Sequence, residues 1–397
     1  MKKQMVVLVA LLISGVAFAD EAKVREAVDL LARQRSGAEL TMDEQSVIDK
    51  ASRDWGSVRD IRDRGRRGET LTQDEKKLIE LAEVVRAKRA ADSRAAYRAA
   101  HPPRASIGLV PLTDLGSGSY EGEEGGLYPG GHNVPPLKHL AAGLKLATSI
   151  VPLGSDGQPS GDGQIVVLAR GMSNATQEFR AFQKLASEDA INPKVLLVDG
   201  AQGGQSADRT ADPSGKYWKG VDRRLAEAGA TREQIQVVWL KQAVPRPKDP
   251  FPAEASRFKH HLVANIHILR DLYPNLKVTY LSSRIYAGYA ESPLNPEPHA
   301  YETAFSVKWL IADQINGVAE MNFDPASGPV RAPWMCWGPY LWADGTTARS
   351  DGLTYSREDL GVDGTHPSGR GRIKIGHQLL TFFKTDPTAS SWFLPSK

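Results

Sequence analysis

Short apolar runs that alternate with amphipathic stretches dominate the second half of the chain. The apolar runs, rich in β-branched residues, lie at 164–169, 195–198, 236–240 and 277–281. Longer stretches at 254–273 and 301–315 repeat apolar residues at helical spacing. Continuously apolar strands that alternate with helices are typical of a parallel sheet covered on both faces. We therefore expect an α/β fold, in the form of a flavodoxin-like three-layer α/β/α sandwich with a parallel sheet.

Residues 20–104 have a different pattern, rich in Ala, Arg, Glu and Asp, which predicts a charged helical module before the sheet. Val24, Ala27, Val28 and Leu31 fall on one face of a first helix. The segment 37–44 recurs at 68–75 after 31 residues, and both copies contain Thr-x-x-Glu, a capping box that begins a helix.

Arginines crowd the middle of this helical module: Arg59, Arg62, Arg64, Arg66 and Arg67. They favour either a solvated helix face of mixed charge or a surface that binds an anionic polymer, a membrane surface or a partner.

Local composition predicts the roles of the remaining parts of the chain. Residues 1–19 have a charged start, a short apolar core and an Ala-x-Ala end, as in a bacterial secretory signal peptide whose cleavage leaves Asp20 first. We expect a secreted or periplasmic protein without an integral membrane segment after cleavage. Residues 105–160, rich in Gly and Pro, are expected to wrap the main domain, which occupies 161–397.

Overall composition limits the functional classes. The chain has 397 residues, 41% hydrophobic, and a formal net charge of +3. This near-neutral balance argues against a dedicated nucleic-acid-binding protein. Cys336 is the single cysteine, so no intrachain disulfide forms.

A glycine turn follows the first apolar run of the main domain. Gly171-Met172-Ser173-Asn174 connects that run to a predicted helix. Open α/β sheets place their chemistry at this edge, just beyond the carboxyl end of a strand. Free backbone N–H groups at the helix start suit a developing negative charge. Ser173 is therefore either a nucleophile or an ordinary helix N-cap.

A second polar stretch lies near the end of the chain, where Asp363 precedes His366 by three residues. A serine nucleophile needs an imidazole to take its proton, and the imidazole needs a carboxylate to orient it. One Asp-x-x-His loop supplies both groups, although a turn with a surface histidine has the same pattern. Asp344, Asp351 and Asp359 are rival carboxylates.

Together these stretches resemble the SGNH (GDSL-type) hydrolase superfamily, nearest to its sialate-O-acetylesterase and acetylxylan-esterase-like branch. That branch has Gly-Gln-Ser-Asn where this chain has Gly171-Met172-Ser173-Asn174, and it closes with Asp-x-x-His, matched by Asp363 and His366. The resemblance covers about residues 160–385. It implies a catalytic triad of Ser173, His366 and Asp363, with no metal and no other cofactor.

The resemblance also implies an oxyanion hole. The Ser173 N–H and a glycine N–H from Gly203 or Gly204, after the next strand, match its first two donors. The third block departs from the family, which has Gly-x-Asn-Asp or Trp-x-Gln-Gly-Glu there. This chain has Trp239-Leu240-Lys241-Gln242, and Gln242 is the best candidate for the third donor.

Several residues near these motifs are candidates for substrate binding: Asn174, Arg284, Tyr286 and Trp337. Arg284 and Tyr286 follow the run at 277–281, and the alternative for both is packing inside the protein. Trp337 belongs to an aromatic segment at 334–342, which suits either a cleft wall against sugar rings or the core.

The sequence thus predicts a secreted serine esterase that removes acyl groups such as acetyl from a carbohydrate or another small ester. Two alternatives stay open. One is an acyltransferase that uses the same triad and a polysaccharide acceptor. The other is a non-catalytic protein on a degenerate SGNH fold that binds a carbohydrate or a partner.

Overall fold

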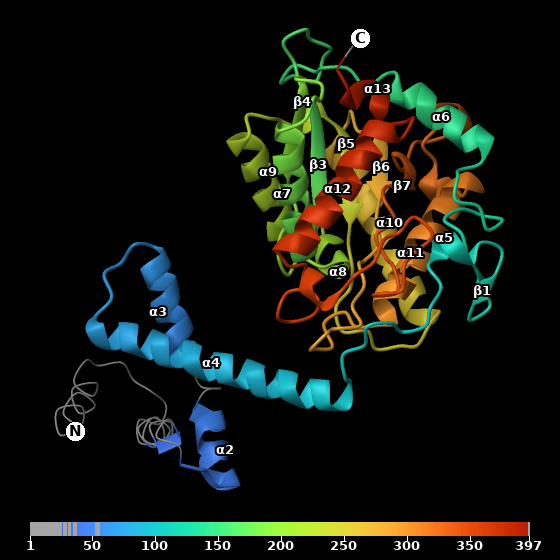
Figure 1. Ribbon diagram of the computed structural model, residues 1–397. Coiled ribbons are helices and arrows are strands. Elements are labelled where there is room, and N and C mark those ends of the chain that lie inside the picture. The colour runs from blue at the N-terminus through green and yellow to red at the C-terminus, as the bar shows by residue number, and fades with distance from the viewer. Residues whose placement is uncertain (1–25, 27–29, 31–32, 35–37, 52–55, 396–397) are drawn as a thin grey trace. The chain divides into compact units, whose positions relative to one another are not determined.

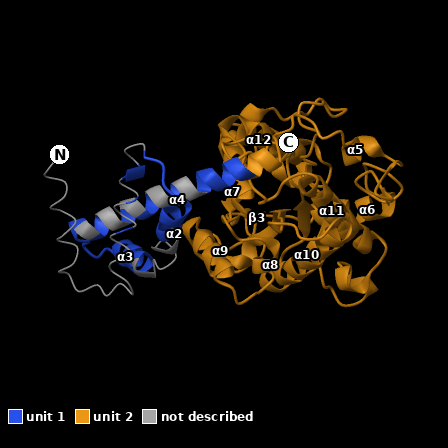
Figure 2. Cartoon of the chain, turned by 90° about the horizontal axis from the view of Figure 1, so that it is seen from below, with its two compact units in different colours: residues 1–96 blue, residues 97–397 orange. Residues whose placement is uncertain are grey.

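The computed structural model divides the chain into two compact units, residues 1–96 and 97–397 (Figure 2). The structure describes residues 26, 30, 33–34, 38–51 and 56–395. The predicted signal peptide therefore lies outside the described residues, as do the four apolar positions of the predicted first helix.

The N-terminal unit is helical, and its helix starts follow the predicted pattern. Its helices are α2 (Met42–Ala51), α3 (Gly56–Arg66) and α4 (Gln73–Ala100), the last of which continues into the second unit. In both repeats the threonine and glutamate of the capping box bond reciprocally. The Thr41 N–H donates to Glu44 at 2.9 Å, and the Thr72 N–H donates to Glu75 at 2.8 Å. The predicted capping boxes are confirmed.

Most of the arginine cluster is paired inside this unit. Its ion pairs are Arg62–Glu83, Arg64–Glu69, Arg64–Glu75, Arg66–Asp63 and Arg67–Glu69. Exposed pairs of this kind contribute little to stability. They do compensate much of the positive charge, as expected for a solvated face of mixed charge.

A five-stranded parallel sheet forms the centre of the second unit (Figure 1). Its strands are β3 (Ile165–Gly171), β4 (Val195–Asp199), β5 (Ile235–Lys241), β6 (Val278–Leu281) and β7 (Trp334–Trp337). Their order in the sheet is β4-β3-β5-β6-β7, and every neighbouring pair is parallel. This is the flavodoxin-like order, in which the chain reverses direction across the sheet between β3 and β5.

The first four strands coincide with the four predicted apolar runs. All residues of β3 and β5 are buried, which explains their uninterrupted apolar sequence. The fifth strand, β7, is not among the predicted apolar runs, because its sequence Trp-Met-Cys-Trp lies in the aromatic segment 334–342. It is fully buried and pairs with β6 at the sheet edge.

Helices cover both faces of the sheet, which makes the three-layer α/β/α sandwich. These helices are α7 (Ser173–Ser187), α8 (Ala207–Thr210), α9 (Lys216–Glu227), α10 (Ala253–Leu272), α11 (His299–Ile315) and α12 (Gly369–Thr385). In Figure 2, α7 and α12 lie on one side of β3, and α8, α9 and α10 lie on the other. Helix α11 packs against α10. Phe182 of α7 stacks on Phe383 of α12 at 5.3 Å between ring centroids.

The Gly- and Pro-rich segment 105–160 packs against this domain. Its short elements are α5 (Leu112–Leu115), β1 (Ser119–Tyr120), β2 (Glu123–Glu124) and α6 (Leu137–Ala147). The last helix of the chain is α13 (Ser390–Phe393). Single 3-10 turns occur at Arg232–Gln234, Ala319–Met321, Pro325–Ser327 and Arg357–Asp359. The Asp344 carboxylate accepts from the backbone N–H groups of Ile107 and Gly108 at 2.7 and 3.0 Å, which anchors the start of the segment.

The contact between α7 and α12 gives a first prediction. Phe182 is fully buried, so Phe182→Ala leaves a cavity and should lower the free energy of unfolding by about 3–5 kcal/mol. Urea unfolding followed by circular dichroism measures the change. Ile373→Ala on α12 is the control, because Ile373 is 53% exposed and its truncation should change stability by less than about 0.5 kcal/mol. Equal losses in both variants would contradict the packing described.

Candidate active site

Ser173 lies at the carboxyl edge of the sheet, where β3 separates β4 from β5. Strand β3 ends at Gly171 and α7 begins at Ser173. Gly171 has a φ of 153°, and a Cβ at this position would collide with the carbonyl oxygen of Lys241 on β5. Only glycine fits so close to the neighbouring strand. The turn therefore places Ser173 at the switch point where open α/β sheets bind ligands.

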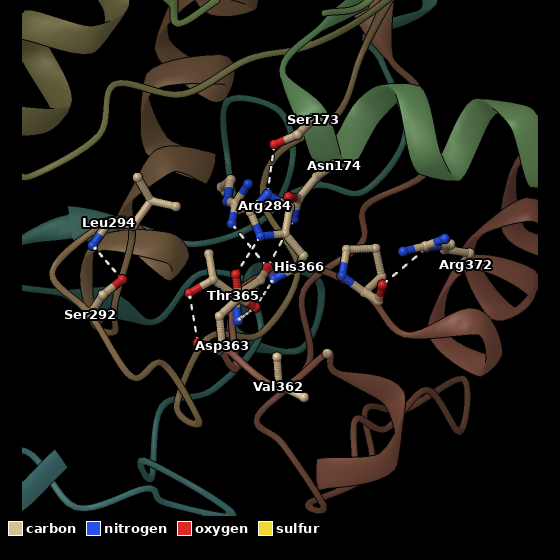
Figure 3. A network of polar contacts seen from close by, with 12 residues as sticks. Ser173, Asn174, Arg284, Ser292, Leu294, Val362, Asp363, Thr365, His366 and Arg372 are labelled. Carbon is tan, nitrogen blue, oxygen red and sulfur yellow. Dashed lines mark hydrogen bonds and ion pairs between the residues drawn. The ribbon is translucent and has the colours of Figure 1, made fainter. Parts of the chain in front are cut away.

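The side chains of Ser173, His366 and Asp363 form a continuous chain of contacts (Figure 3). Oγ of Ser173 lies 2.7 Å from Nε2 of His366, and Nδ1 of His366 lies 2.6 Å from Oδ2 of Asp363. A proton on Nδ1 faces the carboxylate, which leaves Nε2 free to accept the serine proton. The structure thus brings together the three residues that the sequence predicts as a triad.

Local backbone geometry holds the Asp363 carboxylate in place. Its Oδ1 accepts from the N–H groups of Thr365 and His366 at 3.1 and 3.0 Å. Burial by itself would raise the pKa of Asp363, but the hydrogen bonds from the imidazole and from these N–H groups hold that pKa well below its usual range. Asp363 is therefore an anion that faces His366 at neutral pH.

The rival carboxylates are bound elsewhere. Asp344 holds segment 105–160, Asp351 pairs with Arg349 at 2.6 Å, and Asp359 pairs with Lys374 at 2.5 Å. His366 thus has Asp363 as its carboxylate partner.

The predicted glycine loop lies against Ser173. A Cβ on Gly203 would lie 3.7 Å from the Cβ of Ser173, and the Gln202 N–H donates to the Gly171 carbonyl at 3.0 Å. Gly204 has a φ of +73°, which turns the loop after β4. The first-turn N–H groups of α7 have no partner within the helix. The Ser173 and Gly203 N–H groups are thus placed on neighbouring backbone segments, as an oxyanion hole requires.

Gln242, the predicted third donor, is buried and bonded inside the protein. Its amide nitrogen donates to the Gln205 carbonyl at 3.2 Å and to Thr210 Oγ1 at 3.3 Å. In this arrangement Gln242 holds the loop that carries Gly203, and it has no amide hydrogen left for an oxyanion.

A buried ion pair lies between α7 and β5. Nζ of Lys241 contacts both carboxylate oxygens of Glu178 at 2.5 Å, and the side chains are 1% and 0% exposed. Burial lowers the pKa of Lys241 to about 8, although Glu178 opposes this shift. The pair ties the helix that begins at Ser173 to the strand that contacts Gly171. Sequence reasoning missed it, although a lysine that ends an apolar strand was a usable signal.

The predicted substrate-binding residues do not line a surface. Tyr286 and Trp337 are buried, and their side chains donate to the carbonyls of Arg104 and Leu127 at 2.7 Å. The assignment of these two residues to substrate binding is wrong in this structure, because both are core residues. Asn174 and Arg284 are buried as well, but they lie beside the triad (Figure 3).

Comparisons with known proteins identify no family. No family model matches the chain, and no curated protein matches it. Among solved structures, the crystal structure of protein YXIM from Bacillus subtilis is 13% identical over 57% of each chain, with a TM-score of 0.30. The chain thus spans little more than half of that protein, and a TM-score this low supports no inference about function.

Two further observations concern the described residues only. Within them, no three His, Cys, Asp or Glu side chains gather in a way that suits a metal ion. No helix in the described ranges combines the length and the apolar character needed to cross a bilayer.

The ion pair gives a second prediction. Lys241→Met leaves Glu178 charged and unpaired in the core, which should lower the free energy of unfolding by about 3–5 kcal/mol. Lys241→Met combined with Glu178→Leu removes both charges, so we expect it to recover most of that loss. Urea unfolding of the two variants and the wild type tests this. A double variant less stable than Lys241→Met would contradict the account.

Asp363 gives a prediction about pH. Because its folded-state pKa lies below the unfolded value of about 4, it contributes stability above that pH, and the contribution is lost as the pH falls. Asp363→Asn lacks this term. The stability difference between wild type and Asp363→Asn should therefore be larger at about pH 5 than at about pH 3. Urea unfolding at both pH values measures this difference. An unchanged difference would contradict the hydrogen bonds that Asp363 accepts from Thr365 and His366.

Proposed function

We propose that the protein is a serine hydrolase that cleaves carboxylic esters. The observation that carries this proposal is the unbroken contact from Ser173 Oγ through the His366 imidazole to the Asp363 carboxylate, at 2.7 and 2.6 Å. A helix N-cap needs neither of these contacts, whereas a serine nucleophile activated by a His–Asp pair uses both.

In the proposed reaction, Ser173 Oγ attacks the ester carbonyl while Nε2 of His366 takes the serine proton. The Ser173 and Gly203 N–H groups hold the oxyanion of the tetrahedral intermediate. The intermediate collapses, His366 returns the proton to the leaving alcohol, and the acyl group stays on Ser173. Water, deprotonated by His366, then releases the acid. Asp363 holds the imidazole in the required tautomer throughout.

The substrate class rests on the resemblance to the acetylesterase branch of the SGNH superfamily, and we propose an acylated carbohydrate. The charged start and short apolar core of residues 1–19 support export to the periplasm or the cell exterior. The aromatic segment that would have closed a transferase cleft is buried, so no observation favours the acyltransferase. The short distance from His366 to Ser173 weighs against a non-catalytic binding protein.

Hydrolysis of p-nitrophenyl acetate tests the proposal. Ser173→Ala removes the nucleophile and His366→Ala removes the base, so each should lower kcat about 10⁴-fold or more. Both losses should be similar in size, because these residues act as a unit.

Ser187→Ala and His260→Ala are the matched controls, since both residues are exposed on helices and neither contacts the triad. The controls should keep the wild-type rate. A fluorophosphonate probe should label the wild type at Ser173 and leave Ser173→Ala unlabelled. A wild type that neither turns over the ester nor takes the label would refute the proposed function.

A further inference from the structure

One backbone carbonyl joins the two halves of the site. The oxygen of Thr365 accepts from Nδ2 of Asn174 at 3.0 Å and lies 3.5 Å from Nη2 of Arg284 (Figure 3). Thr365 immediately precedes His366, and Asn174 immediately follows Ser173. A single acceptor therefore connects the start of α7, the loop after β6 and the loop that carries His366.

These groups are buried, so they act inside the protein. Asn174 is 3% exposed, Arg284 is 4% exposed and Thr365 is 1% exposed. A polar group at such depth is stabilised by its hydrogen bonds, and loss of a bond to a charged donor costs more than loss of a neutral one. The two donors therefore stabilise the Thr365 carbonyl in the position where both can reach it.

Arg284 is buried at this place. It follows β6 after Ser282 and Ser283, and its backbone N–H donates to Oγ1 of Thr303 at 3.4 Å. Among the described residues, none accepts a hydrogen bond from its Nε. Its guanidinium instead reaches the His366 loop through Nη2, which contacts the Thr365 carbonyl at 3.5 Å.

Two backbone hydrogen bonds also support the loop that carries His366. The Glu291 N–H donates to the Asp363 carbonyl at 3.0 Å, and the Gly361 N–H donates to the His366 carbonyl at 2.7 Å. The loop after β6 therefore holds the His366 loop at both Asp363 and Thr365, while Asn174 holds it from the nucleophile's helix.

We infer that Asn174 and Arg284 are positioning residues. Through the Thr365 carbonyl they set the distance between His366 Nε2 and Ser173 Oγ, and they do not contact substrate. The expected effect on kcat rests on the proposed function. The restraint of the His366 loop by Asn174 and Arg284 does not depend on catalysis.

Steady-state kinetics distinguish positioning from substrate binding. Asn174→Ala and Arg284→Lys should each lower kcat with p-nitrophenyl acetate about 100-fold, because a shift of about 1 Å in the imidazole costs that much. KM should stay unchanged, since no substrate contact is lost. The double variant should lose less than the product of the two single effects, because both act on one carbonyl.

Asn192→Ala is the matched control. Asn192 also donates from Nδ2 to a backbone carbonyl, that of Trp392 at 2.9 Å. It precedes the amino end of β4, whereas the triad lies beyond the carboxyl ends of the strands. It should keep the wild-type kcat and KM. Circular dichroism confirms folding of each variant, and Asn174→Ala decides the question if Arg284→Lys does not fold.

Hydrogen exchange of the peptide that spans 361–367 gives a readout without catalysis. Exchange there should rise in Asn174→Ala and Arg284→Lys and stay unchanged in Asn192→Ala. A rise in KM at constant kcat, or unchanged exchange, would overturn the positioning role while the proposed function stands. If the wild type has no esterase activity and takes no fluorophosphonate label, faster exchange in the two variants would still support positioning, and the proposed function alone would fail.

Discussion

The close approach of β3 and β5 is the constraint on which the site depends. Gly171 lies against the carbonyl oxygen of Lys241, and no side chain fits between them. This contact fixes where β3 ends and where α7 begins, and hence where Ser173 lies. The buried pair of Lys241 and Glu178 ties the same helix to the same strand. Displacement of the helix start would separate this pair and leave two unpaired charges in the core, which is costly.

Local sequence accounts for part of the triad and tertiary structure for the rest. Asp363 and His366 meet within one turn, since the backbone N–H groups of that turn bind the carboxylate. Ser173 comes from a strand end 193 residues earlier in the chain. Only the parallel sheet and the packing of α12 against α7 bring the two segments together.

Burial decides which polar and aromatic residues serve the architecture. Tyr286 and Trp337 looked suited to sugar binding, yet both donate to backbone carbonyls in the core. Asn174 and Arg284 lie next to the triad, but their donors point at the Thr365 carbonyl. Residue type alone could not separate these roles, because an amide or a guanidinium suits a substrate and a backbone oxygen equally well.

The sequence by itself determined the α/β class, four of the five strands of the parallel sheet and the capping boxes, because hydrophobic period and capping chemistry are local properties. It also identified Ser173, Asp363 and His366 as candidates, since glycine turns and Asp-x-x-His are local as well. Tertiary structure alone decided that β7 is a strand, that the Gln242 amide bonds to Gln205 and Thr210, and that Lys241 pairs with Glu178. Each of these depends on which distant segments pack together. A lysine at the end of an apolar strand suggests a buried partner, but the local pattern does not say which residue that partner is.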